Sequence, residues 1–181
     1  NFGTLTQMKR EMMAEVAATL AFSTIQNNDK VGVIFFSDKI EKYIPAQKGK
    51  THVLHIIREL LSFEPTSSGT DIAGALEYFA RAQKRRCTAF LISDFIGQKS
   101  LDKPLMIAGN RHEINAIQIY DRREAEMPNI GLVKFRDAEM GKDVWADTAL
   151  ASVRNAYAEA WRQSEAEWDT LLTKLGINHI A

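Results

Sequence analysis

The chain lacks the features that mark secreted and membrane-spanning proteins. It has a single cysteine, Cys87, which excludes a disulfide framework and a thiolate metal site and favours a reducing compartment. No apolar run approaches the ~20 residues that a membrane-spanning helix needs, and no signal peptide opens the sequence. From these absences we expect a cytoplasmic location and no membrane contact through this chain.

An excess of charge of one sign is also missing, because 23 basic side chains balance 23 acidic ones. No net field therefore attracts the chain to nucleic acid or to an anionic membrane, and we expect neither as a partner. The basic run 84–86 precedes a predicted buried strand and is interpreted as a solvated helix end. With 181 residues, 45% of them hydrophobic, a single domain over residues 1–181 is expected.

What the sequence does contain is an alternation of predicted helices and strands. Apolar residues spaced three and four apart predict helices at 5–26, 53–61, 72–79, 101–109 and 150–175. Continuous apolar runs predict strands buried on both faces at 31–36, 88–93 and 114–120. This order predicts an α/β layer sandwich around a mostly parallel sheet.

Shorter strands complete the prediction. Residues 39–44 read as an edge strand that follows a tight turn and is ended by Pro45. Residues 131–147 read as a β-hairpin. Gly176 caps the last helix, and residues 177–180 begin a final strand.

Two oxygen-bearing side chains stand where an α/β protein binds its ligands. Thr70 lies in the loop Ser68-Gly69-Thr70-Asp71, and Asp94 ends the predicted strand 88–93. Because ligands bind beyond the carboxyl ends of parallel strands, both can face one crevice. A hydroxyl and a carboxylate are hard ligands suited to Mg²⁺. The sequence therefore predicts Thr70 and Asp94 as metal ligands.

Several segments, taken in order, resemble the bacterial DUF58 family of von Willebrand factor A-like domains. They are Phe2-Gly3-Thr4, Val31-Gly32-Val33-Ile34-Phe35-Phe36-Ser37, Ser68-Gly69-Thr70-Asp71-Ile72, Leu91-Ile92-Ser93-Asp94-Phe95 and Phe135-Arg136-Asp137-Ala138-Glu139-Met140-Gly141. The resemblance covers nearly the whole chain. It implies a Rossmann-like three-layer sandwich with a hairpin insertion.

The family resemblance implies a metal-ion-dependent adhesion site. That site combines an Asp-x-Ser-x-Ser motif after the first strand with a loop Thr, matched by Thr70, and a strand-end Asp, matched by Asp94. Thr70 would bind Mg²⁺ directly and Asp94 through water, and an acidic side chain of a partner protein would complete the coordination. The Asp-x-Ser-x-Ser motif has no counterpart and would end just before Asn1. We therefore expect little or no metal affinity in this chain.

The resemblance also implies that the first, central strand is missing. It would lie between strands 31–36 and 88–93, so its absence leaves two apolar strand edges open. Open edges pair readily with other chains. We expect the gap to be closed either by direct pairing of these two strands or by self-association with a second copy.

In function, the resemblance implies a non-enzymatic protein-binding domain that acts with a MoxR-type AAA+ ATPase in complex assembly or remodelling. Two alternatives stay open. A Mg²⁺-dependent phosphoryl-transfer enzyme would use Asp94, but we find no general base, nucleophile, phosphate-binding Lys or Gly-rich loop for it. Otherwise the metal site is vestigial and the hairpin 131–147 carries the binding.

Thr70 and its neighbour Asp71, as well as two histidines, also have simpler structural interpretations. Thr70 or Asp71 can serve as the N-cap of a helix that starts at Ile72, and capping does not exclude metal binding. His52 and His55 are three residues apart on a predicted helix and could share a metal. No third ligand is suggested nearby, so both are interpreted as ordinary histidines.

Overall fold

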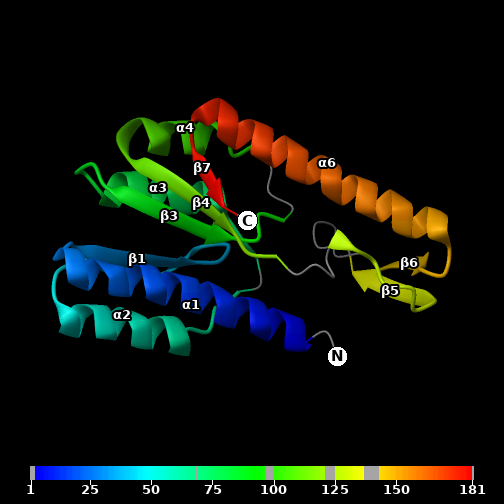
Figure 1. The fold of residues 1–181 in the computed structure, drawn as a ribbon, viewed down its shortest axis with the longest axis horizontal. Coiled ribbons are helices and arrows are strands. Elements are labelled where there is room, and N and C mark those ends of the chain that lie inside the picture. The colour runs from blue at the N-terminus through cyan, green and yellow to red at the C-terminus, as the bar shows by residue number, and fades with distance from the viewer. Residues whose placement is uncertain (1–2, 68, 97–99, 121–124, 137–142, 181) are drawn as a thin grey trace.

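The computed structural model describes residues 3–67, 69–96, 100–120, 125–136 and 143–180. Its elements follow the predicted alternation and confirm the α/β fold class (Figure 1). They are α1 Gly3–Asn27, β1 Val31–Phe36, β2 Ile40–Gln47, α2 Lys50–Ser62, α3 Ile72–Ala82, β3 Thr88–Ser93, α4 Asp102–Arg111, β4 Glu113–Gln118, β5 Leu132–Arg136, β6 Asp143–Asp147, α6 Ala151–Leu175 and β7 Asn178–Ile180.

The first half of the chain folds as a β-hairpin covered by two helices. Strand β1 pairs with β2 antiparallel, and α1 packs along α2. Helix α2 contacts β1, and α1, which lies beside α2, also contacts β3 (Figure 1). The buried residues that we call the first cluster are Ala21, Phe35, Ile44, Val53 and Ile56. The two helices and two strands of this half were predicted from the sequence. Strand β1, however, pairs antiparallel with β2 in a separate sheet, whereas we expected it in the mostly parallel sheet.

Strand β2 runs further than the sequence predicted, because it passes through Pro45 instead of ending there. The pairing register shifts between Val31 and Val33, because Pro45 and Ala46 of β2 lie opposite the single residue Gly32 of β1 and form a β-bulge in β2. A bulge tolerates proline because it interrupts the hydrogen-bond ladder. A Cβ atom on Gly32 would lie 2.7 Å from the carbonyl oxygen of Ile44, so the close approach of the two strands requires glycine.

The second half builds a parallel sheet with helices packed on it. Strand β3 pairs with β4, and β4 pairs with β7, in the order β3-β4-β7. Helices α3, α4 and α6 each contribute a completely buried side chain to its core: Ile72, Leu105 and Leu172. The remaining buried residues of this second cluster are Leu76, Leu91, Phe95, Leu101, Ala108, Ile114, Ala116 and Ile177. This half confirms the predicted parallel sheet flanked by helices.

The two halves meet without a shared sheet. In the part of the chain that the structure describes, β1 and β3 belong to separate sheets, so direct pairing, one of the two alternatives that we expected, is wrong. Phe36, at the end of β1, packs against the second cluster. The Nζ atom of Lys9 on α1 lies 3.4 Å from Oδ2 of Asp94 at the end of β3. Self-association through the open edges stays a prediction.

Helix α6 joins the second cluster to the predicted hairpin, which forms from β5 and β6. Gly176 ends the helix with a left-handed φ of 66°, as predicted. At its other end, the completely buried Thr148 donates a hydrogen bond from Oγ1 to the carbonyl of Gly131 (2.7 Å) and accepts one from the N–H of Ile130 (2.9 Å). No described helix has the length and apolarity that crossing a membrane requires.

Candidate functional site at the carboxyl ends of β1 and β3

The loop before α3 is tied to the end of β1 by a network of hydrogen bonds. The Ser37 hydroxyl donates to Oε1 of Glu41 (2.7 Å), and the Thr66 N–H donates to the same oxygen (2.9 Å). The N–H of Asp71 donates to the carbonyl of Ser37 (2.7 Å). The hydrogen bond from Ser37, followed by those from Thr66, lowers the pKa of the Glu41 carboxyl. The loop therefore holds a defined position beside β1.

Thr70 and Asp71 divide the two roles that the sequence left open. Asp71 is the N-cap of α3, and its Oδ1 accepts a hydrogen bond from the N–H of Gly74 (2.9 Å). This confirms the capping interpretation for Asp71. Thr70 precedes the cap and is exposed on the loop. Its role as a metal ligand stays a prediction.

Asp94 follows the last residue of β3, as the sequence predicted. Its Oδ2 pairs with Lys9, and its Oδ1 accepts a hydrogen bond from the N–H of Ile96 (3.3 Å). The chain turns sharply at Phe95, whose φ of 54° is uncommon for a bulky residue. The hydroxyl of Ser93 accepts a hydrogen bond from the Phe95 N–H (3.2 Å) and supports this turn.

The oxygen ligands that Thr70 and Asp94 offer are of the type that Mg²⁺ prefers, but they are too few. Thr70 and Asp94 offer a hydroxyl and a carboxylate, whereas Mg²⁺ takes about six oxygen ligands. The ammonium of Lys9 already stands beside the Asp94 carboxylate. In the described ranges, no three His, Cys, Asp or Glu side chains come together in a way that could hold a metal. Thr70 and Asp94 by themselves therefore supply fewer oxygen ligands than Mg²⁺ takes.

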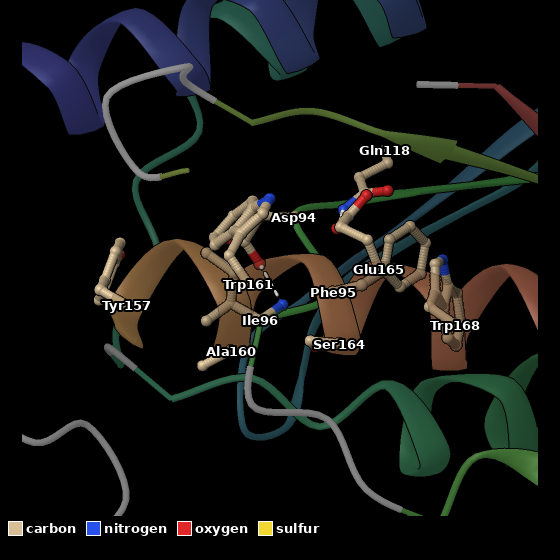
Figure 2. Close-up of a pocket in the computed structure, with 10 residues that line it drawn as sticks. All are labelled: Asp94, Phe95, Ile96, Gln118, Tyr157, Ala160, Trp161, Ser164, Glu165 and Trp168. Carbon is tan, nitrogen blue, oxygen red and sulfur yellow. Dashed lines mark hydrogen bonds between the residues drawn. The ribbon is translucent and has the colours of Figure 1, made fainter. Parts of the chain in front are cut away.

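Beside Asp94 lies an open groove of about 360 Å³ between the strand ends and α6 (Figure 2). Ten residues from the ends of β3 and β4 and from α6 line it. They are Asp94, Phe95, Ile96, Gln118, Tyr157, Ala160, Trp161, Ser164, Glu165 and Trp168. The groove stands where ligands bind in open α/β sheets, beyond the carboxyl ends of the strands.

The groove has an aromatic wall and a fixed carboxylate. The rings of Phe95 and Trp168 lie 4.4 Å apart between centroids, and Gln118 donates a hydrogen bond from Nε2 to Oε1 of Glu165 (2.6 Å). Trp161, Glu165 and Trp168 were not among the site residues predicted from the sequence. The available signal was their spacing, because residues 161, 165 and 168 share one face of a helix.

The pair His52 and His55 does not converge on a common ligand. The Nε2 atom of His52 lies 2.9 Å from the carbonyl oxygen of Val31, and Nδ1 of His55 lies 3.9 Å from Oε1 of Glu59. His52 therefore joins α2 to β1, as an ordinary structural histidine would.

The buried histidine His112 was not predicted from the sequence. His112 is 2% exposed, and its ring centroid lies 4.6 Å from that of Phe79. Burial, followed by the charge of Arg111, lowers the pKa of the His112 imidazole. Its Nδ1 lies 3.6 Å from Sγ of Cys87, and burial raises the pKa of that thiol. Both groups are therefore uncharged parts of the packing at neutral pH.

Comparisons with known proteins agree with the resemblance seen in the sequence. The model of one family, described as "Protein of unknown function DUF58", matches residues 1–167. An uncharacterized protein of Mycobacterium tuberculosis is 31% identical over 164 residues, which are 88% of this chain and 51% of the relative. An uncharacterized protein of Mycobacterium avium is 35% identical over 119 residues, 65% of this chain and 70% of the relative. The chain thus spans about half the length of the first of these relatives.

Two solved structures share the fold. An aerotolerance-related membrane protein of Bacteroides fragilis gives a TM-score of 0.55 at 18% identity, over 92% of this chain and 79% of that chain. The conserved hypothetical protein BatB of Bacteroides thetaiotaomicron gives a TM-score of 0.50 at 16% identity, over 90% of this chain and 88% of that chain. The first of these is described as a membrane protein, and this corrects the cytoplasmic location that we expected from the sequence.

Proposed function

Because this chain belongs to the DUF58 family, we propose that it is a non-enzymatic protein-interaction domain whose binding surface lies at the carboxyl ends of β1 and β3. The observation that carries the proposal is the anchored loop. The hydrogen bond from the Asp71 N–H to the Ser37 carbonyl (2.7 Å) holds the segment with Thr70 against the end of β1. Asp94 ends β3, and Lys9 reaches it from α1. A rigid scaffold that presents polar loop residues is typical of a binding surface.

The metal part of the proposal concerns an extended form that carries the Asp-x-Ser-x-Ser ligands. In that form Thr70 and Asp94 would complete a Mg²⁺ site, and the bound ion would supply an open coordination position for an acidic side chain of the partner. The support is the family resemblance together with the donor chemistry of the two side chains. For Asp94 to take this role, Lys9 must release its carboxylate.

The partner that the resemblance favours is a MoxR-type AAA+ ATPase. The description of the Bacteroides fragilis neighbour as a membrane protein supports a place at a membrane surface for the assembly. Fractionation of cells that produce the chain tests this location. Recovery with the total-membrane pellet, and release by alkaline carbonate, is the expected result, whereas recovery in the supernatant alone contradicts it.

Calorimetric titration with Mg²⁺ and Mn²⁺ tests the metal site. We expect binding by the extended form, little or none by residues 1–181, and loss of binding in Thr70→Ala and Asp94→Ala. Asp29→Ala, which removes a carboxylate from the turn after α1, serves as the matched control. Absence of binding in the extended form, or equal binding by both forms, contradicts the proposal.

A second candidate surface is the hairpin β5–β6. Three of its apolar side chains are largely exposed: Leu132 at 66%, Trp145 at 62% and Val144 at 51%. An isolated two-stranded hairpin is only marginally stable in water, so exposed apolar groups on it favour a covered state. The test is a pull-down of the MoxR-type ATPase by this chain. If Trp145→Ser abolishes the pull-down while Thr70→Ala and Asp94→Ala leave it unchanged, the hairpin carries the binding and the metal site is vestigial.

A further inference from the structure

The groove between β3 and α6 combines negative charge with aromatic surface. Its lining includes the carboxylates of Asp94 and Glu165 and the aromatic side chains of Tyr157, Trp161 and Trp168. None of the ten lining residues is Lys, Arg or His. Aromatic ring faces attract cations, and carboxylates pair with them. The lining therefore complements a positively charged group.

Glu165 is held in place by a buried polar side chain. Gln118 is 4% exposed, donates from Nε2 to Oε1 of Glu165 (2.6 Å), and has its own Oε1 at 3.1 Å from Nε2 of His179. Gln118 thereby fixes one oxygen of the Glu165 carboxylate. From the described residues, the other oxygen, Oε2, receives no hydrogen bond. The lining of the groove thus includes a carboxylate that Gln118 holds by one oxygen (Figure 2).

The two carboxylates of the groove differ in their internal partners. Asp94 is paired with Lys9, which reaches it from α1. In the described ranges, Glu165 has the amide of Gln118 as its partner and no cation. The charge of Asp94 is therefore balanced within the chain, whereas the charge of Glu165 can be balanced by a ligand.

We propose that this groove binds an arginine side chain of a partner protein, with the guanidinium paired to Glu165 and stacked on Trp161. The planar guanidinium fits better than an ammonium, because it stacks on aromatic rings and pairs with a carboxylate through two hydrogen bonds. A volume of about 360 Å³ is near the lower end of the range for ligand pockets and accommodates one long side chain. The inference rests on the proposed interaction function but not on its metal site.

The test uses the peptide acetyl-Gly-Arg-Gly-amide and the fluorescence of the chain. Trp145→Phe serves as the background, because it leaves Trp161 and Trp168, which both line the groove, as the fluorescent tryptophans. Saturable quenching or a spectral shift is expected with the arginine peptide. The citrulline peptide, a neutral isostere of the same shape, should bind about tenfold more weakly, because it lacks the charge-assisted hydrogen bonds. The lysine peptide should also bind more weakly than the arginine peptide.

The matched variants are Glu165→Gln and Glu167→Gln on the same helix. Glu165→Gln keeps an oxygen for Gln118 and removes the charge, so we expect it to weaken the arginine peptide about tenfold. Glu167 is exposed and bonds Gln163 (3.1 Å) outside the groove, so Glu167→Gln should bind as the unsubstituted chain does. Thermal unfolding of both variants shows whether they are folded.

Several outcomes overturn the inference. They are the absence of a saturable signal, equal binding of the citrulline or lysine peptide, unchanged affinity in folded Glu165→Gln, and equal loss in Glu167→Gln. Concentration-dependent dimerisation that Glu165→Gln abolishes would assign the groove to a second copy instead. The arginine site uses no metal, so a chelator should leave peptide binding unchanged. The peptide test and the metal titration can therefore fail independently of each other.

Discussion

Strands β1 and β4 show how little the apolar content of a strand says about its burial. Strand β1 has the sequence VGVIFF, yet of its six residues Phe35 alone is buried. Strand β4 has the sequence EINAIQ, and every residue after Glu113 is buried. The difference lies in the neighbours, because β4 pairs on both edges, with β3 and β7, whereas β1 pairs with β2 alone in the described sheets. Burial is thus set by position in the sheet and by the helices that cover it.

The contrast extends to the two clusters that surround these strands. The first cluster draws on α1, α2, β1 and β2, which are adjacent in the sequence, and the second on residues from Ile72 of α3 to Ile177, just before β7. Phe36 and the Lys9–Asp94 ion pair connect the halves. Four predictions, given from the largest expected effect to the smallest, break or sharpen this comparison.

The largest effect is expected from Leu105→Ala, which truncates a completely buried side chain of the second cluster. A buried Leu→Ala change costs about 2–5 kcal/mol of unfolding free energy. We expect hydrogen exchange to accelerate in β3 and β4 more than in β1 and β2. Ile56→Ala, in the first cluster, should give the reverse pattern. Equal acceleration in both halves after either change would show one cooperative unit instead of two.

Gly32→Ala should destabilise the first half by about 1–3 kcal/mol, the usual cost of overpacking. The new Cβ would meet backbone atoms, the Ile44 carbonyl oxygen at 2.7 Å and the Ala46 nitrogen at 2.8 Å, which cannot rotate away. Gly109→Ala in α4 is the matched control, since nothing lies within 4 Å of its Cβ, and it should stabilise the chain by about 0.5–1 kcal/mol. Urea denaturation measures both, and a neutral Gly32→Ala would refute the close strand approach.

His112 should make the stability of the second half depend on pH. Because burial lowers its pKa in the folded chain from 6.5, the unfolded chain binds the proton more readily. The contribution of uncharged His112 to the free energy of unfolding is therefore fully present above pH 6.5. It is lost as the pH falls from 6.5 toward the lower pKa of His112 in the folded chain. The slope for one proton is at most about 1.4 kcal/mol per pH unit. Urea titrations at pH 7 and 5 should show a smaller pH dependence in His112→Phe, and an unchanged dependence would contradict this assignment.

The smallest effect is expected for the ion pair that links the halves. Lys9→Met, Asp94→Asn and the double variant form a cycle whose coupling energy should be about 0.2–1 kcal/mol, the range of partly exposed pairs. High salt should reduce the coupling. A coupling of zero at low salt would show that Lys9 does not hold Asp94 in solution.

The sequence was sufficient for most helices and strands, because their apolar periodicity is strong. It was insufficient where a contact between distant segments decides the outcome. Proline lacks an N–H and was expected to end the strand, but Pro45 lies in the bulge opposite Gly32, and β2 continues to Gln47. Asn115 and Gln118 look unsuited to a buried strand, yet Asn178 donates to Asn115 (2.9 Å) and His179 lies against Gln118. These partners come from β7 and leave no local signal.

The candidate site shows the same division. Thr70 and Asp94 were found from loop and strand-end chemistry, and the cap at Asp71 from its place before a helix. The Glu41 carboxylate and the groove beside Asp94 were missed, because each joins residues from separate elements. Trp161 and Trp168 share a helix face, but only the folded chain brings Gln118 to Glu165.

The pairing of β4 with β7 has a consequence for folding during synthesis. Asn115 and Asn178 are 63 residues apart in the chain, whereas β1 and β2 follow each other directly. Contacts of high sequence separation form late, since a long loop must be closed first. On a ribosome, the first half can assemble as soon as α2 has emerged. The third strand of the parallel sheet must wait for β7, and until then the edge of β4 that pairs with β7 is open to chaperones or to misassembly.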